Sequence, residues 1–138
     1  MIQSRLSRAE ISHTLSEALT HPELLHPDDS AILFYDLTAI KARVEALKRV
    51  FPTGTLHAVA VKANPLLKIL SFASGLHTGA EVASLPELYL AEKAGFEPDH
   101  IVFDSPCKTR EELETALKKG VYLNADSFEE LGRIAEIL

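Results

Sequence analysis

The sequence contains a single cysteine, Cys107, and no tryptophan among its 138 residues. One cysteine cannot form an internal disulfide, so nothing indicates the disulfide scaffold of a small secreted domain. Basic residues are also few, because 14 Lys and Arg stand against 20 Asp and Glu and give a net charge of -6. Nucleic-acid binding needs clustered Lys and Arg, so this composition argues against a nucleic-acid partner and favours a small molecule.

Long apolar runs are absent as well. No window approaches the roughly 18 apolar residues of a membrane span, and the N-terminal MIQSRLSRAEISHTL lacks the apolar core of a signal peptide. We therefore expect a cytoplasmic protein without a membrane partner. The six histidines have no H-x-x-x-H spacing and no C-x-x-C is present, so we expect no metal site. The two glycine-rich nucleotide-binding loop motifs are missing too.

The composition, with 46% hydrophobic and 25% charged residues, is typical of a soluble globular domain. Ser7 and Glu10 form an S-x-x-E capping box, which predicts an amphipathic helix over 8–19. The proline-rich segment 21–30 is expected to be a connector. The sequence thus predicts an N-terminal helix and connector over 1–30, followed by one larger domain over 31–138.

From residue 31 onward, strand-like runs alternate with helical ones. Strands are expected at 31–36, 56–63, 79–84, 100–105 and 121–126, with helices at 38–51, 66–74, 86–94, 109–119 and 128–138. This alternation predicts an α/β fold with a parallel sheet. The units are too few to close an eight-stranded barrel, which takes ~250 residues. The pattern therefore leaves two options: an open doubly wound sheet, or the first part of a longer (β/α)8 TIM barrel.

Charged residues stand at the ends of the predicted strands. Lys62 ends the apolar run of AVAVKANP, and Glu81, Asp104 and Asp126 end the next three strands. Ligands of parallel α/β folds bind at the carboxyl ends of the strands, so we expect these four side chains to converge there. Asp104 and Asp126 each precede a Ser and a helix start, so helix capping is the simpler interpretation for them. Lys62 and Glu81 do not precede a helix start in this way, so they are the stronger candidates for a functional site.

A lysine among apolar neighbours is costly to keep charged, and its neutral amine can attack a carbonyl group. Schiff-base chemistry at Lys62 is therefore the natural hypothesis. It has two versions: the lysine condenses with a substrate, as in an aldolase, or it holds pyridoxal phosphate. Cys107 has Lys108 beside it and is a second candidate nucleophile, although an inert thiol is the favoured interpretation.

The chain from about residue 31 to its end resembles the alanine-racemase-fold pyridoxal-phosphate decarboxylases of the diaminopimelate and ornithine decarboxylase type. The stretches that carry the resemblance are LFYDLTAIKARVEALKRVFP, AVAVKANP, GLHTGAEVASLPEL, IVFDSPCKTREEL and YLNADSFEELGRI. Alanine racemases of this fold also use a V-K-A-N element but continue differently from Pro65 onward. The resemblance therefore favours a decarboxylase over a racemase.

The resemblance implies that Lys62 binds pyridoxal 5'-phosphate and that Glu81 lies near the cofactor and this lysine. It also implies that Ser84, in the VAS stretch that follows Glu81, is a cofactor-binding position. It implies decarboxylation of a basic or diamino amino acid such as diaminopimelate or ornithine. Pro106, Cys107 and Lys108 resemble the ornithine branch more than the diaminopimelate branch. The sequence does not select among these substrates.

The family's phosphate loop, the acid that pairs with the pyridine nitrogen, the stacking histidine and the second domain's catalytic residues have no match in these 138 residues. We therefore expect this chain to be an N-terminal barrel segment that does not decarboxylate on its own. The alternative is an inactive or stand-alone module that binds pyridoxal phosphate. An incomplete barrel leaves open strand edges, so a homodimer is expected.

Overall fold

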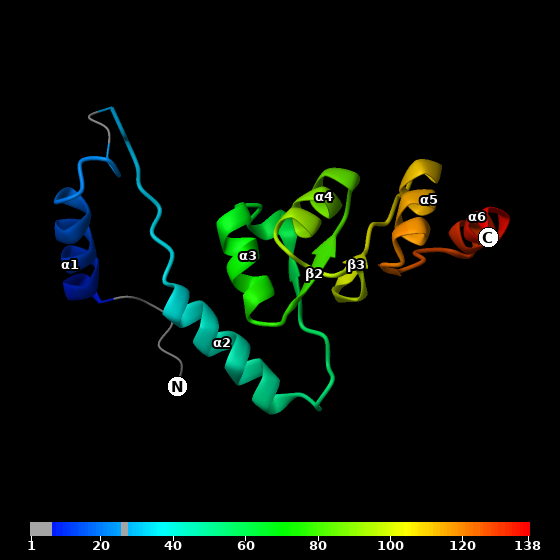
Figure 1. The fold of residues 1–138 in the computed structure, drawn as a ribbon, viewed down its shortest axis with the longest axis horizontal. Coiled ribbons are helices and arrows are strands. Elements are labelled where there is room, and N and C mark those ends of the chain that lie inside the picture. The colour runs from blue at the N-terminus through cyan, green and yellow to red at the C-terminus, as the bar shows by residue number, and fades with distance from the viewer. Residues whose placement is uncertain (1–6, 26–27) are drawn as a thin grey trace. The chain divides into compact units, whose positions relative to one another are not determined.

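The computed structural model describes residues 7–25 and 28–138, which divide into two units, Met1–Arg43 and Val44–Leu138 (Figure 1). Residues 1–6 of the predicted N-terminal region lie outside the described residues. So do residues 26 and 27 of the predicted connector, including His26. The predicted domains, 1–30 and 31–138, stay a prediction.

The first unit contains the predicted N-terminal helix, α1 (Arg8–Leu19). Its capping box is formed in full: the Glu10 N–H donates to Ser7 Oγ at 3.2 Å, and the Ser7 N–H donates to the Glu10 carboxylate at 2.7 Å. The first of these bonds satisfies a backbone donor that has no partner within the helix, so the helix begins at this sequence signal.

The predicted strand over 31–36 is wrong. Within the described residues this segment joins no sheet, and its apolar side chains are exposed, with Leu33 at 80%. Apolar β-formers make a strand only when a neighbouring strand takes up their backbone hydrogen bonds, and none does so here. The segment leads into α2 (Leu37–Val50), where Asp36 Oδ1 accepts the Ala39 N–H at 2.9 Å.

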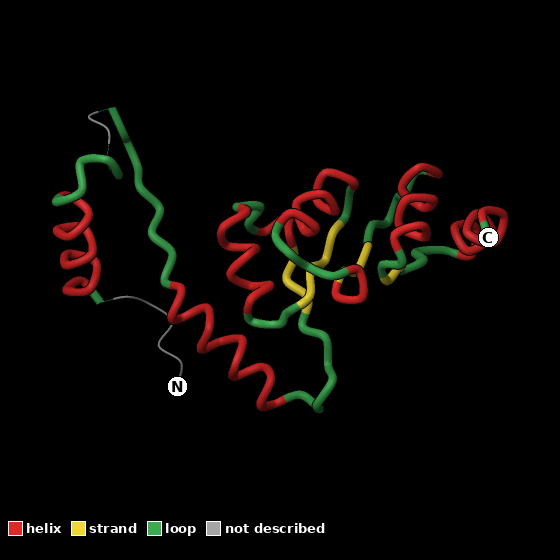
Figure 2. Tube along the Cα trace, in the orientation of Figure 1, coloured by secondary structure: helices red, strands yellow, loops and turns green. Residues whose placement is uncertain are grey.

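The second unit is built on a four-stranded parallel sheet in the order β1-β2-β3-β4. Short strands alternate with helices along the chain, as Figure 2 shows. The strands are β1 (Ala58–Ala60), β2 (Gly79–Val82), β3 (Ile101–Phe103) and β4 (Tyr122–Leu123). The helices are α3 (Leu67–Gly75), α4 (Leu85–Lys93), α5 (Arg110–Lys119) and α6 (Phe128–Ile137), with short 3₁₀ turns at η1 (Val61–Ala63) and η2 (Pro98–His100). The predicted alternation of strands and helices is confirmed, although each strand is shorter than expected.

One face of the sheet is packed against helices. Val82, Ile101 and Phe103 point to this face and are fully buried against Leu70 of α3 and Leu88 of α4. The register places a different row on the other face, and its members are only partly covered: Ala60, Glu81, Val102 and Tyr122. The hydrophobic core of this unit therefore lies between the sheet and one layer of helices.

This arrangement decides between the two predicted sheet types. A doubly wound sheet reverses its strand order and carries helices on both faces, whereas a barrel keeps sequential order with helices outside. Here the order is sequential, and the helices pack on one face. The second unit therefore has the architecture of the first part of a (β/α)8 barrel. No helix among the described residues is long and apolar enough to cross a membrane.

Candidate functional site

Lys62 lies just beyond the carboxyl end of β1, in the 3₁₀ turn η1, rather than within a strand as predicted. The Asn64 N–H donates to the Val61 carbonyl at 3.1 Å, and Asn64 Oδ1 accepts the Leu66 N–H at 3.2 Å. Pro65 keeps Asn64 extended, since a proline disfavours helical backbone in the residue before it. The motif KANP thus turns the chain away from the sheet and leaves Lys62 at its edge.

The side chain of Lys62 is 62% exposed. The prediction that it is surrounded by apolar neighbours is therefore wrong, although Val61 beside it is fully buried. The strand's alternation ends at Ala60, so the burial of Val61 says nothing about the residue after it. The amine is open to a ligand that approaches from the edge of the sheet.

Glu81 is the partner of Lys62. Lys62 Nζ donates to Glu81 Oε1 at 3.3 Å, and the Glu81 side chain is only 19% exposed. The two residues meet because Ala60 and Glu81 are directly opposite in the parallel register of β1 and β2. The expected convergence of these two side chains at the carboxyl edge is confirmed.

Asp104 and Asp126 do not join this pair. In the described part of the chain neither side chain forms an ion pair or hydrogen bond with Lys62. Their interpretation as helix caps is also wrong, because the capping side chains are Thr109 and Ser127. Both aspartates act through their backbone: Asp104 N–H donates to the Val82 carbonyl, and Asp126 N–H donates to Glu130. The helices begin at Arg110 and Phe128, close to the predicted starts, so the capping positions are the residues directly before them and not the two aspartates.

Ser84 begins α4. Its hydroxyl accepts the Glu87 N–H at 3.4 Å, while the Glu87 carboxylate accepts the Ala83 N–H at 2.8 Å. It lies two residues beyond β2, at the same edge as Glu81. Its helix-capping role is a property of the fold, and cofactor binding by Ser84 stays a prediction.

The sequence did not indicate that Lys108 is buried. Its ammonium donates to the Ser105 carbonyl and to Glu130 Oε2, both at 2.7 Å, rather than to the neighbouring Cys107. Cys107 itself is exposed. One signal was available: Ser127 and Glu130 form an S-x-x-E pattern, which places the Glu130 carboxylate back over the start of its helix.

The Glu130 carboxylate is almost completely buried. Burial by itself raises the pKa of Glu130, but the hydrogen bonds from Lys108 and from the Asp126 N–H act against it, and the charges of Lys108 and Arg133 add to them. The net effect lowers the pKa of Glu130 below its usual range. Glu130 is therefore held as a carboxylate.

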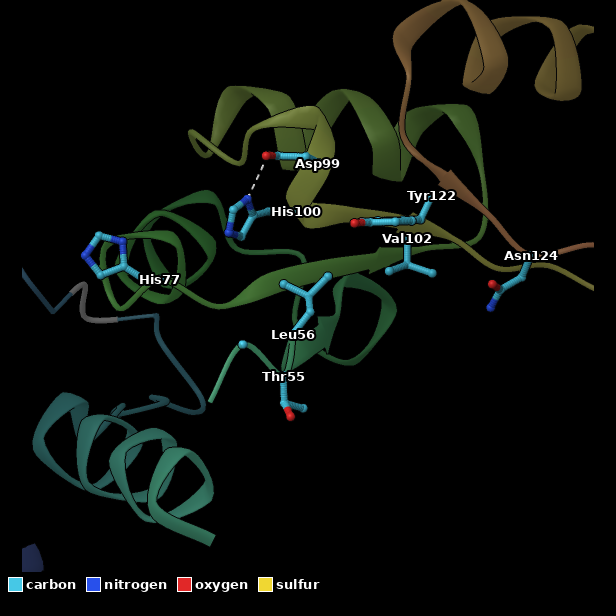
Figure 3. A pocket seen from close by; sticks show the side chains of 9 residues that line it. Thr55, Leu56, His77, Asp99, His100, Val102, Tyr122 and Asn124 are labelled. Atoms are coloured by element: carbon cyan, nitrogen blue, oxygen red, sulfur yellow. Dashed lines mark hydrogen bonds and ion pairs between the residues drawn. The ribbon is translucent and has the colours of Figure 1, made fainter. Parts of the chain in front are cut away.

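A cavity lies elsewhere on the second unit. It measures about 630 Å³. Val102, Tyr122 and Asn124 line it from the sparsely covered face of the sheet. The other lining residues precede the strands and are Gly54, Thr55, Leu56, His77, Asp99 and His100. Figure 3 shows the neighbouring side chains of Asp99 and His100 joined by a dashed line, with His100 Nδ1 2.8 Å from Asp99 Oδ1. Lys62 does not line this cavity. Lys62 and this cavity are thus at different places on the unit.

These features define an α/β-barrel protein with an accessible, carboxylate-paired lysine at the carboxyl edge of its first two strands. The chain belongs to the family described as pyridoxal-dependent decarboxylase, pyridoxal binding domain, whose pattern matches residues 37–138. The resemblance inferred from the sequence is confirmed, and the cofactor of the family is pyridoxal phosphate.

Individual relatives agree with this assignment. The chain is 38% identical over 119 residues to diaminopimelate decarboxylase of Helicobacter pylori, covering 85% of this chain and 29% of that protein. The crystal structure of a Helicobacter pylori diaminopimelate decarboxylase complexed with L-lysine superposes with a TM-score of 0.74 at 32% identity, covering 89% of this chain and 30% of that one. Ornithine decarboxylase from Entamoeba histolytica gives a TM-score of 0.75 at 26% identity, covering 91% and 40%. The chain thus spans about 29% of the length of the first of these relatives.

Proposed function

We propose that this chain provides the cofactor-anchoring part of a pyridoxal-phosphate-dependent amino-acid decarboxylase, with Lys62 as the attachment residue. The observation that carries the proposal is the Lys62–Glu81 pair at the carboxyl edge of β1 and β2. A primary amine that is exposed at this edge fits a cofactor aldehyde, because it can be reached from the side where ligands of barrels bind.

The cofactor, when bound, supplies an electron sink for the bond that is broken in the substrate. Glu81 Oε1 accepts a hydrogen bond from Lys62 Nζ, which favours a position of the amine beside the carboxyl ends of β1 and β2. Attack on a carbonyl requires Nζ to lose a proton, and Glu81 Oε1 is the carboxylate oxygen within reach of that proton. We include Ser84 as a third contact, since it lies at the same edge on the loop after β2.

The substrate class is an amino acid with a second polar end, such as diaminopimelate or ornithine. Among solved structures the identity is 32% to the Helicobacter pylori diaminopimelate decarboxylase and 26% to the Entamoeba histolytica ornithine decarboxylase. This difference favours diaminopimelate, against the similarity of Pro106, Cys107 and Lys108 to the ornithine branch. We also propose that the protein is cytoplasmic and forms a homodimer.

A second candidate is a module that binds pyridoxal phosphate without decarboxylase activity. The 62% exposure of Lys62 favours it, because water has access to the amine and to any group attached there. Decarboxylases need a pocket that holds the scissile bond in one orientation and limits water. Binding and catalysis are therefore tested separately.

The first test is site-specific labelling. We expect the protein incubated with pyridoxal phosphate and reduced with borohydride to carry the pyridoxyl group on Lys62, as located by peptide mass mapping. Lys62→Ala should remove this label, and Lys68→Ala, which changes an exposed lysine on α3, should not. Label spread evenly over surface lysines would contradict cofactor anchoring by Lys62.

Release of carbon dioxide from diaminopimelate or ornithine by the same preparation would then distinguish the two candidates. Labelling of Lys62 without carbon dioxide release favours the binding module. Trapping of a carbonyl substrate on Lys62 by borohydride, with no cofactor present, would instead indicate the aldolase-type chemistry that the sequence left open.

A further inference from the structure

A second lysine–glutamate pair lies inside the unit, away from the exposed Lys62. Lys108 Nζ and Glu130 Oε2 are 2.7 Å apart, and their side chains are 0% and 2% exposed. Lys108 belongs to the loop between β3 and α5, and Glu130 to the first turn of α6. The pair joins residues 22 positions apart in the sequence.

Hydrogen bonds from both loops meet at this pair. Lys108 Nζ also donates to the Ser105 carbonyl, and Glu130 Oε2 also accepts the Asp126 N–H at 2.9 Å. Arg133 donates from Nη1 to the Lys108 carbonyl at 2.8 Å and from Nη2 to Glu130 Oε1 at 3.5 Å. One buried carboxylate therefore ties the loop after β3 to the loop after β4.

Stability alone does not explain such a pair. The cost of taking two charges out of water is often not recovered, and apolar side chains of similar volume commonly stabilise a protein as well or better. An apolar pair lacks the directional contacts that hydrogen bonds provide. Hydrogen bonds to Ser105, Asp126 and Arg133 allow one arrangement of the two loops, while apolar contacts allow several.

The two loops leave the carboxyl ends of β3 and β4. Parallel strands end at the same edge, so this is the edge that carries Lys62 and Glu81 on β1 and β2. The Asn124 N–H donates to the Phe103 carbonyl, which extends the sheet hydrogen bonds into the second loop. A displacement of either loop thus changes the shape of the proposed cofactor edge.

We propose that Lys108 and Glu130 are positioning residues that hold the loops 104–109 and 124–127 in one arrangement at the cofactor edge. The role of the loops in cofactor binding rests on the function proposed above, whereas their fixation by the pair does not. Neither residue needs to touch the cofactor.

The test replaces both charges at once, with Lys108→Met and Glu130→Leu in the full chain. We expect a urea unfolding midpoint equal to or above that of the wild type, since apolar replacement of a buried pair is tolerated. Hydrogen exchange of peptides covering 104–109 and 124–127 should become about tenfold faster or more, with exchange in α3 unchanged. Pyridoxyl labelling of Lys62 should slow several-fold.

The matched control is Lys119→Met with Glu92→Leu, because this lysine–glutamate pair also joins distant parts of the chain, α5 and α4, but is partly exposed, at 37% and 34%. It should leave exchange in both loops unchanged. A second variant, Glu130→Asp, retains the charge and shortens the side chain, and it should speed loop exchange in the same way. It replaces the double variant if that variant fails to fold. Unchanged loop exchange in a folded variant would overturn the positioning role. Absence of Lys62 labelling in the wild type would instead overturn the proposed function, and loop exchange would still decide the role of the pair.

Discussion

Lys62 and Lys108 both pair with a glutamate, and burial gives the two pairs different properties. The exposed Lys62 is bound by a single hydrogen bond in contact with water, so it can exchange Glu81 for a ligand at small cost. Lys108 has no such freedom, because its ammonium is buried and donates to both the Ser105 carbonyl and Glu130 Oε2. At the scale of residues, the lysine that we propose as the cofactor anchor is the weakly held one.

The buried pair predicts an acid-sensitive stability. Because the pKa of Glu130 is lower in the folded chain than in the unfolded chain, its contribution is complete above the usual carboxyl range and is lost as the pH falls through the folded pKa. Glu130→Gln leaves Lys108 buried without a counter-charge and should reduce the free energy of unfolding by about 3–5 kcal/mol at neutral pH. It should also flatten the acid limb of a urea-denaturation series.

The control for this variant is Glu114→Gln, which removes the partner of Arg110 from an exposed pair on α5. Its effect should stay within about 1 kcal/mol. Equal losses in the two variants would mean that the burial of Glu130 has no energetic consequence.

At the scale of elements, local signals set the helix boundaries. Thr109 caps α5 and exchanges hydrogen bonds with Glu112, and Gly120 ends the helix in a left-handed conformation with φ 72°. These are the capping box and terminal glycine that the sequence contains, and the predicted helix over 109–119 is confirmed to within one residue. Strand boundaries have no comparable local signal, since they depend on the neighbouring strand.

The close approach of two strand entrances makes a prediction at the same scale. A Cβ atom on Gly79, at the start of β2, would lie 2.7 Å from the His100 carbonyl oxygen and 2.9 Å from Leu56 Cδ1. Gly79→Ala should therefore reduce the free energy of unfolding by about 1–3 kcal/mol, as overpacking does. The measurement is urea denaturation of the full chain.

Gly132→Ala in α6 is the matched control, because nothing lies within 4 Å of the added Cβ atom. This exchange should stabilise the protein by about 0.5–1 kcal/mol, the helix propensity gained by alanine. A Gly79→Ala variant as stable as this control would show that the strands separate easily at this point.

At the scale of the whole molecule, the second unit buries one face of its sheet and leaves the other partly open. Tyr122 on the open face is 58% exposed, and Val102 and Glu81 lie in the same row. Parallel sheets are normally covered on both faces. In a (β/α)8 barrel this row of side chains points to the barrel interior, so its exposure does not identify a docking surface. The proposed homodimer rests instead on the open strand edges of the sheet.

Light scattering over a range of protein concentrations measures this association. We expect a dimer in the wild type and a roughly tenfold weaker one for Tyr122→Glu, since Tyr122 lies on the outer strand β4 and a charge there opposes edge pairing. Tyr89→Glu on α4 is the control, because Tyr89 is also 58% exposed but lies on the helix layer. A wild type that stays monomeric at all concentrations would refute the dimer.

The sequence by itself determined the local features: the positions of the helices, the capping box of α1, the alternation with strands, the lysine after an apolar run, and the resemblance to the family. These depend on residues within a few positions of one another, so propensity and pattern are sufficient. Tertiary structure decided the rest. It exposed Lys62, left Asp104 and Asp126 out of the expected convergence with Lys62 and Glu81, and enclosed Lys108 with Glu130. It also left segment 31–36 without a partner strand in the described part of the chain. Burial and pairing between distant positions follow from strand register and from which face the helices cover, and no local stretch of sequence contains that information.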